Sequence, residues 1–330
     1  MNELELRVIR GEDVRRLLGW AECVDAVAAA MIEVSRGGAV MPLRQVMPVP
    51  SAGGLFGTMP GCLSEPSAFG IKLLSLMPGN PAAGYSSHLG LYVLFEPEHG
   101  RPVAVMEASA LTAIRTAAAS VVATRALARP GVSTLAILGT GEEARAHLEC
   151  WTAVRPFERV IVWGRRIEAA RELAAHARRI GVPSVEVADS TSAAVRTADV
   201  VCTVTAARTA ILNGADVRPG THLCLVGASV ASAREVDDEC VARARYFVDS
   251  RASAMAQAGE LLDAIAASVV TEDHVAGEIG EVLGGAIAGR RSDEEVTIYK
   301  SLGVAAQDIA AATIVHRRAV ELGVGSIVAI

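Results

Sequence analysis

The apolar residues in the second half of the chain form short runs that alternate with amphipathic segments. The runs lie near residues 134–138, 159–163, 184–187, 200–204, 222–226 and 246–248. Segments with helical spacing lie near residues 142–153, 167–180, 191–197 and 235–243. Strands that alternate with helices in this way form a parallel sheet with right-handed crossovers. The pattern predicts an α/β fold with a Rossmann-type, doubly wound sheet of six strands, which holds a dinucleotide at the carboxyl ends of its strands.

The first part of the chain has a different pattern. Residues 1–10 alternate as a strand, and residues 12–18 and 21–35 have helical spacing. Short strands broken by Gly and Pro follow near 43–48, 54–59, 69–77, 88–95 and 101–106. Their short connections favour a mainly antiparallel sheet in a separate α+β domain. A helix is predicted over 109–128, and a last helix, over 303–322, is expected to pack back onto this first domain.

Composition narrows the class of protein. The 330 residues are 51% hydrophobic and carry a net charge of −6, which argues against a nucleic-acid partner. No run approaches the roughly 18–20 apolar residues that cross a bilayer. The acidic start lacks the apolar core of a signal peptide, so we expect a soluble, cytoplasmic protein without a membrane partner. The six cysteines and seven histidines show no metal-ligand spacing, and we predict no metal.

A glycine-rich turn follows the first strand of the second half. Its sequence is Gly139-Thr140-Gly141-Glu142-Glu143-Ala144, a G-x-G-x-x-A pattern between an apolar run and a helical segment. Gly139 permits the tight turn, Gly141 allows backbone N–H groups to approach a pyrophosphate, and Ala144 lets the helix pack closely. An ordinary glycine-rich turn between a strand and a helix is the alternative.

The end of the next strand bears on which cofactor is bound. The strand 159–163 is followed by Gly164-Arg165-Arg166, with no acidic residue to bind the ribose hydroxyls of NAD. Guanidinium groups suit a 2′-phosphate, so we expect NADP(H), with NAD(H) possible. Alternatively, both arginines are solvated residues that open the next helix. Two later segments, Thr203-Val204-Thr205 and Gly227-Ala228-Ser229, follow strands and should line the same crevice.

Three cationic residues precede the dinucleotide-binding segment. Arg44, Lys72 and Arg115 lie among apolar or small residues, where an unpaired charge is costly. Only Lys72 and Lys300 among the 31 basic residues are lysines, which hints at sites that require a compact ammonium. A substrate carboxylate would pair the three cations and be oriented by them. For each residue alone, an internal salt bridge or a snorkelling side chain is the alternative.

Taken together, these motifs resemble the ornithine cyclodeaminase/mu-crystallin family. The resemblance covers almost the whole chain in order, and rests on order and spacing more than on any one segment. The matching segments are residues 41–44, 57–60, 70–80, 87–96, 110–124, 138–144, 162–165, 225–229, 234–239, 247–250, 277–283 and 298–312.

The resemblance implies two domains: residues 1–122 with 306–330 bind substrate and dimerise, and residues 123–305 bind the nicotinamide cofactor. It implies that Arg44, Lys72 and Arg115 bind the substrate carboxylate, with Met59 and His88 beside them and Ser229 as a further catalytic residue. Arg165 would read a phosphate, with Gly164 and Arg166 next to it. The other implied cofactor contacts are Thr116, residues 139–144, Thr203, Val204, Thr205, Val226, Gly227, Ser229, Lys300, Ser301 and Leu302.

Two departures from the family pattern indicate which activity to expect. True ornithine cyclodeaminases carry an aspartate at the position of Ser229 and a glutamate at the position of Gly57. Both changes resemble mu-crystallin, whose family role includes reducing cyclic ketimines. We therefore expect NAD(P)H-dependent reduction of Δ1-pyrroline-2-carboxylate or Δ1-piperideine-2-carboxylate to L-proline or L-pipecolate. The alternatives are an ornithine cyclodeaminase, an alanine dehydrogenase-like enzyme and a non-catalytic NADPH-binding protein.

Overall fold

The computed structural model describes residues 4–86 and 88–330. The chain divides into two compact units, Met1–Arg115 with Val304–Ile330, and Thr116–Gly303. The boundaries expected from the sequence were 122/123 and 305/306. Helix α3 (Ala108–Leu127) begins in the first unit and ends in the second. No helix in the described residues is long and apolar enough to cross a membrane.

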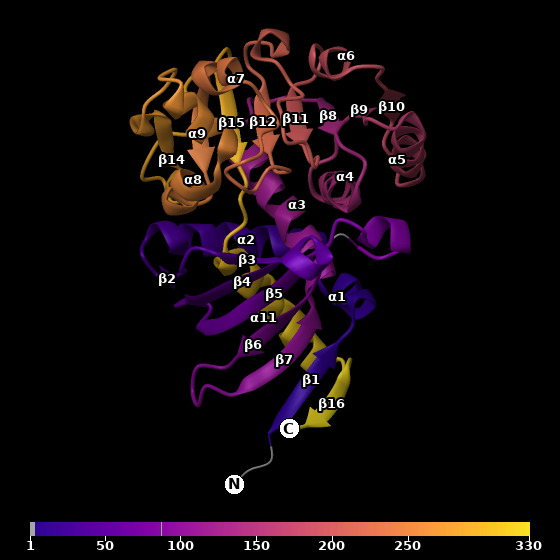
Figure 1. Ribbon diagram of the computed structural model, residues 1–330, viewed down its shortest axis with the longest axis vertical. Coiled ribbons are helices and arrows are strands. Elements are labelled where there is room, and N and C mark those ends of the chain that lie inside the picture. Colours follow the sequence, from indigo (N-terminus) through magenta and orange to yellow (C-terminus); the bar gives the residue numbers. More distant parts are fainter. Residues whose placement is uncertain (1–3, 87) are drawn as a thin grey trace. The chain divides into compact units, whose positions relative to one another are not determined.

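The first unit is built on an eight-stranded, mainly antiparallel sheet (Figure 1). Its strand order is β16-β1-β7-β6-β5-β4-β2, and β3 pairs with β4. Among the described strands of this sheet, only β1 and β7 pair in parallel. The strands are β1 (Glu5–Ile9), β2 (Ala39–Val40), β3 (Gln45–Val49), β4 (Gly54–Leu63), β5 (Ala68–Leu76), β6 (His88–Phe95), β7 (Pro102–Glu107) and β16 (Ser326–Ala329).

Three α-helices lie wholly within the described residues of the first unit: α1 (Gly11–Leu17), α2 (Trp20–Ser35) and α11 (Ala305–Glu321). Helix α11 packs against α2 and against β4, β5 and β6, as expected for the last helix (Figure 1). The register of the sheet aligns Met59, Lys72, Tyr92 and Met106 on one buried row across β4, β5, β6 and β7. The sheet therefore presents a lysine to its own apolar core.

The second unit contains an eight-stranded, wholly parallel sheet among its described residues. The order is β10-β9-β8-β11-β12-β15-β13-β14, and the order reverses between β8 and β11. The strands are β8 (Thr134–Leu138), β9 (Arg159–Trp163), β10 (Ser184–Val187), β11 (Val200–Thr203), β12 (His222–Leu225), β13 (Ala244–Val248), β14 (Val275–Glu278) and β15 (Val296–Lys300). The helices wholly within it are α4 (Glu142–Val154), α5 (Ile167–Arg179), α6 (Thr191–Val195), α7 (Asp238–Arg243), α8 (Arg251–Gln257), α9 (Gly259–Ala266) and α10 (Ile279–Leu283).

This sheet confirms the predicted α/β class and corrects three details of the prediction. The sheet has eight strands rather than the predicted six, because the apolar pattern did not reveal β14 and β15. Strand β15 lies between β12 and β13, so 246–248 is not the next neighbour of 222–226. The segment was missed because Thr297 and Lys300 interrupt its apolar run, although the whole strand is buried. The helix predicted over 235–243 begins only at Asp238, because the side chain of Asp237 caps it. Glu235 therefore lies outside the helix.

Candidate functional site

A buried carboxylate joins two of the three predicted cations in the first unit. Lys72 on β5 places its Nζ 2.9 Å from Oδ1 of Asp308 on α11. Arg115 on α3 places its Nε 2.9 Å from the same Oδ1, and its Nη1 donates to Oε1 of Gln307 at 2.9 Å. All four residues are at most 4% exposed. The ion-pair alternative left open for Lys72 and Arg115 is therefore realised, with one partner shared between them.

The surroundings shift the pKa values of this cluster in opposite directions. Burial lowers the pKa of Lys72, Arg115 and Arg44 lower it further, and Asp308 restores part of the loss, so the value falls to about 7. Burial raises the pKa of Asp308, but Lys72 and Arg115 outweigh burial and hold it below its usual value. Lys72 can therefore exchange a proton near neutral pH while Asp308 stays ionised.

The third cation, Arg44, is near enough to Lys72 to lower its pKa. It is partly exposed and lies just before β3, rather than on the strand predicted over 43–48. Met59 is buried directly opposite Lys72 in the sheet register, as a neighbour of the cluster. The backbone of His88 opens β6, but its side chain lies outside what the structure describes, so its predicted role stays a prediction.

Tyr92 is a residue of this cluster that the sequence did not suggest. It pairs with Lys72 in the sheet register and is fully buried, and its hydroxyl has no hydrogen-bond partner. Burial raises the pKa of Tyr92, and Asp308 raises it further, so the hydroxyl keeps its proton. A buried hydroxyl without a partner is unusual in a folded protein, and a catalytic role is one of the explanations for it.

In the second unit, the predicted glycine-rich turn lies between β8 and α4. Gly139 has a φ of +135°, and a Cβ there would lie 2.5 Å from the carbonyl oxygen of Val204. Gly141 is the N-cap of α4, and a Cβ on it would meet no atom within 4 Å. The helix therefore begins at a turn with open space before it, where N–H groups and the helix dipole favour an anion. Glu142 and Glu143 would contribute backbone rather than carboxylate groups.

A buried glutamate braces two predicted cofactor loops. Oε1 of Glu235 accepts hydrogen bonds from the backbone and side chain of Thr205, both at 2.7 Å. Its Oε2 accepts from Oγ1 of Thr203 and from the backbone N–H of Gly227, also at 2.7 Å. A Cβ on Gly227 would lie 2.1 Å from the carbonyl oxygen of Thr205, so the close approach requires glycine. The segments after β11 and β12 are thus fixed to each other.

The end of β15 is held in a similar way. Lys300 donates to the carbonyl oxygen of Ala228 at 2.5 Å and lies 2.7 Å from Oε1 of Glu260 on α9. Oδ2 of Asp249 accepts from the backbone N–H groups of Leu302 and Gly303. Oγ of Ser301, a predicted cofactor contact, is buried without a hydrogen-bond partner. That unused hydroxyl fits a site built for a polar ligand.

The remaining predicted cofactor residues lie around the same strand ends. Arg165 and Arg166 follow β9 and are both exposed, and Gly164 passes close to Thr140. Val204 follows β11 and Val226 follows β12, and both are buried. Thr116 lies on α3 and is 6% exposed. Ser229 is partly exposed, three residues after Val226.

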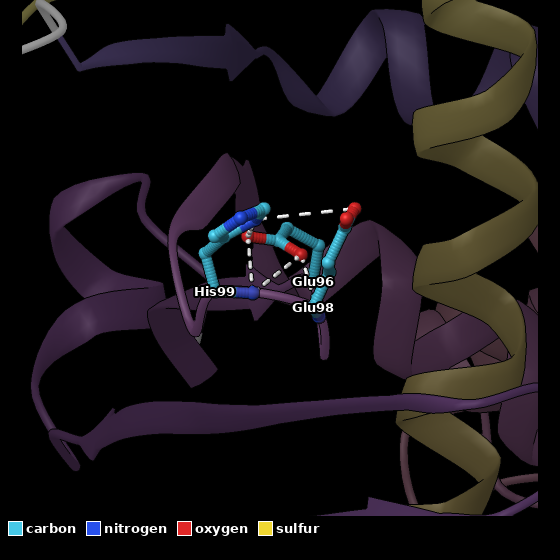
Figure 2. Close-up of side chains that lie close together, drawn as sticks. All are labelled: Glu96, Glu98 and His99. Atoms are coloured by element: carbon cyan, nitrogen blue, oxygen red, sulfur yellow. Dashed lines mark hydrogen bonds and ion pairs between the residues drawn. The ribbon is translucent and has the colours of Figure 1, made fainter.

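A surface cluster of three potential metal ligands lies at the β6–β7 turn (Figure 2). The carboxylate of Glu96 accepts backbone hydrogen bonds from Glu98, His99 and Arg101, and a side-chain bond from Arg101. Partial desolvation raises the pKa of Glu96, but these donors outweigh it and lower the value to about 2. Because the donors already occupy the carboxylate, Glu96 serves to close the turn, and the absence of a metal cofactor stays a prediction.

The fold defines an α/β protein of two units. The second unit has the parallel sheet typical of dinucleotide-binding domains, and the first unit contains the buried cations Lys72 and Arg115. A model of the ornithine cyclodeaminase/mu-crystallin family matches residues 5–323. The chain belongs to this family, and the family resemblance seen in its sequence is confirmed. Ketimine reductase mu-crystallin of Mus musculus is 36% identical to it over 296 residues, which are 89% of this chain and 90% of the relative.

Two solved structures extend the similarity to three dimensions. Δ(1)-pyrroline-2-carboxylate reductase of Thermococcus litoralis, in complex with NADH and L-proline, has a TM-score of 0.94 at 32% identity, covering 97% of this chain and 99% of the other. An archaeal alanine dehydrogenase dimer with bound NAD has a TM-score of 0.92 at 33% identity, covering 98% and 99%. Relatives with different reactions therefore share the fold, and the fold alone does not choose among them.

The two glycines of the turn give a matched pair of variants. We expect Gly139→Ala to lower the free energy of unfolding by about 1–3 kcal/mol, because a non-glycine residue is strained there and contacts Val204. Gly141→Ala should cost less than about 1 kcal/mol of stability, since its φ is −84° and the space is open. Urea unfolding measures both. Equal losses in the two variants would contradict this account of the turn.

Proposed function

We propose that this protein reduces small cyclic imines that carry a 2-carboxylate, using a nicotinamide cofactor bound by the second unit. The observation that carries the proposal is the charge of the buried cluster in the first unit. The charged groups that act on the pKa of Lys72 are the cations Arg115 and Arg44 and the anion Asp308. Two buried cations, Lys72 and Arg115, share the single carboxylate of Asp308, and a substrate carboxylate is the ligand that would balance the second charge.

Each residue of the cluster has a definite part in this proposal. Arg44 and Arg115 grip the substrate carboxylate, and Asp308 fixes Lys72 and Arg115 in place. A nicotinamide cofactor, when bound, supplies the hydride, with its electron pair, that reduces C2 of the imine. Lys72, whose pKa is about 7, holds the proton that the imine nitrogen requires at neutral pH.

Two positions favour reduction over the cyclodeaminase alternative. The residue three positions after Val226 is Ser229 rather than aspartate, so no carboxylate is present there to take a proton from an ornithine ammonium. Gly57 stands where cyclodeaminases carry glutamate, although a Cβ there would approach no atom closer than 3.7 Å. The backbone therefore does not demand glycine, and the missing carboxylate points to a different substrate.

The test compares wild type with Lys72→Met in assays with cyclic imines, ornithine and alanine. We expect wild type to oxidise NADPH or NADH with a cyclic imine. The variant should lose at least about 100-fold in kcat/KM because a proton donor is removed. Cofactor affinity, followed by NADH fluorescence, should stay unchanged. Proline formed from ornithine without net cofactor change, NADH formed only from alanine, or cofactor binding with no turnover would each replace this proposal by one of the alternatives.

The pH profile gives a second readout in the same experiment. Wild-type kcat/KM should fall as pH rises through about 7, because the free protein loses the Lys72 proton there. Lys72→Arg should move the fall to higher pH, since guanidinium stays protonated. Binding of 2-furoate, which has no titrating nitrogen, separates the titration of Lys72 from that of the imine. The pH range from 5 to 9 is centred on the Lys72 pKa of about 7. Binding of 2-furoate that does not change over this range would contradict a role for the Lys72 proton.

For the cofactor, we propose that NADP(H) is preferred over NAD(H), although the structural relatives above were captured with NADH or NAD. Arg165 and Arg166 follow β9 where an NAD-binding protein usually places an acidic residue. Replacing both with alanine should weaken NADPH binding by at least about tenfold, the loss of one charge-assisted phosphate contact. NADH binding should stay unchanged, as should both affinities in the control Arg171→Ala on α5. Equal losses for the two cofactors would contradict the preference.

We further propose that two copies of the chain associate through the face of the first sheet opposite Lys72. Residues that alternate with Lys72 on β5, such as Leu73, pair with apolar residues of β6, such as Leu91, which is 49% exposed in the single chain. Phe69 and Phe95 stack on the same face, with ring centroids 5.2 Å apart. A broad apolar sheet face of this kind is typical of a partner interface.

Leu91→Glu should convert the protein from dimer to monomer, because a charge is introduced into the proposed apolar contact. The measurement is size-exclusion chromatography with light scattering. Val320→Glu on α11, at a position 53% exposed, is the control and should leave the dimer intact. A monomeric wild type, or a dimeric Leu91→Glu variant, would show that this face is not the interface.

A further inference from the structure

Three fully buried carboxylates lie at one half of the parallel sheet. Glu235, Asp249 and Glu260 are all 0% exposed. Of the described residues of the second unit that are buried, Lys300 is the only lysine or arginine. It pairs with Glu260 at 2.7 Å and is close enough to Glu235 to lower the pKa of that carboxyl. Glu235 and Glu260 thus share one buried cation between them.

All three carboxylates act on the segments that follow neighbouring strands. Glu235 holds the segments after β11 and β12, and Asp249 holds the segment after β15. Glu260 acts on the segment after β12 through Lys300, which donates to the carbonyl oxygen of Ala228. In a dinucleotide-binding sheet the adenosine lies over the strands on the glycine-turn side, and the nicotinamide lies beyond the reversal of strand order. These strands are on the nicotinamide side.

The contacts favour the ionised form of Glu235. A carboxylate has about four acceptor positions, and four donors fill them here. Burial raises the pKa of Glu235, and Lys300, Thr203 and Thr205 lower it in part. A proton on either oxygen could be accepted only by the hydroxyl of Thr203 or Thr205, because the backbone N–H groups of Thr205 and Gly227 cannot accept one. Asp249 likewise accepts backbone N–H groups, which cannot accept a proton in return.

A ring that loses a hydride gains one positive charge. We propose that the buried carboxylates Glu235 and Glu260, only partly balanced by Lys300, stabilise the oxidised, positively charged nicotinamide over the reduced, neutral one. This inference rests on the proposed function, because it requires that the second unit binds the cofactor. These residues are positioning residues that act through their field, which is little screened in a buried site. The consequence is a bound cofactor biased toward giving up its hydride.

Glu260→Gln tests the inference with little structural change. Its Oε1, which contacts Lys300 and Tyr246, is retained in glutamine. The amide nitrogen takes the place of Oε2, which has no hydrogen-bond partner. The readout is the ratio of the dissociation constants of NAD+ and NADH, or of NADP+ and NADPH, which reports the reduction potential of the bound cofactor. We expect the ratio to rise by about threefold to tenfold, because the oxidised form loses an attractive charge.

Lys300→Met is the opposite test, because it removes the balancing cation. The ratio should fall by a similar factor, and the double variant, in which neutral groups replace the pair, should return close to the wild-type ratio. The double variant also keeps the test open if either single variant is unstable. Glu295→Gln is the control. Glu295 directly precedes the amino end of β15, so this substitution removes the same charge far from the carboxyl end of the strand. It should leave the ratio unchanged.

The outcomes distinguish a failure of this inference from a failure of the proposed function. Ratios that stay constant in the folded variants, or that move in the same direction for Glu260→Gln and Lys300→Met, would overturn the inference and show a merely structural pair. A wild-type protein that binds neither the oxidised nor the reduced cofactor would instead overturn the proposed function. Thermal unfolding of every variant shows that the affinities are compared between folded proteins.

Discussion

The carboxylate of Asp308 is the interaction on which the first unit depends. It joins Lys72, 236 residues earlier in the chain, and Arg115, 193 residues earlier, at one buried point. Removing one partner of a buried ion pair costs about 3–5 kcal/mol, because the remaining charge is left without compensation. The last helix is therefore tied to the sheet by charge as well as by apolar packing. The same contacts hold two of the proposed carboxylate-binding groups in fixed positions.

The second unit uses buried charge in a comparable way. Glu235, Asp249 and Glu260 each take hydrogen bonds from, or act on, a segment that follows a strand of the parallel sheet. Short polar loops at strand ends are usually the mobile part of such a fold. Here buried acceptors fix them, so that a cofactor would meet a prearranged surface. In both units, groups that are costly to bury are retained where the proposed chemistry requires fixed positions.

Much of the architecture followed from the sequence, because it depends on local patterns. Six of the eight strands of the parallel sheet, the helices α4 to α7 and the turn around Gly139 and Gly141 were predicted from the spacing of apolar residues and glycines. Lys72 and Arg115 were singled out because each is a charge in an apolar or small-residue setting, and the structure buries both. Strand β15 escaped notice because its end at Lys300 does not read as an apolar strand.

The partners of these charges could not be predicted in the same way. Asp308 contacts Lys72 across 236 residues, and no local periodicity encodes such a pairing. The rule that found Lys72 would also have marked Asp308, which lies within a run of small and apolar residues. It would not have shown that the two meet. The unused hydroxyl of Tyr92 is visible only when every neighbouring donor and acceptor is placed.

The most direct measurement is a double-mutant cycle on the free energy of unfolding, using Asp308→Asn, Lys72→Met and the double variant. If Asp308 and Lys72 are bonded as described, the two effects should be non-additive, with a coupling energy of about 1–3 kcal/mol. Effects that add to within about 0.5 kcal/mol would show that the two residues do not interact, and would contradict the account of the cationic cluster.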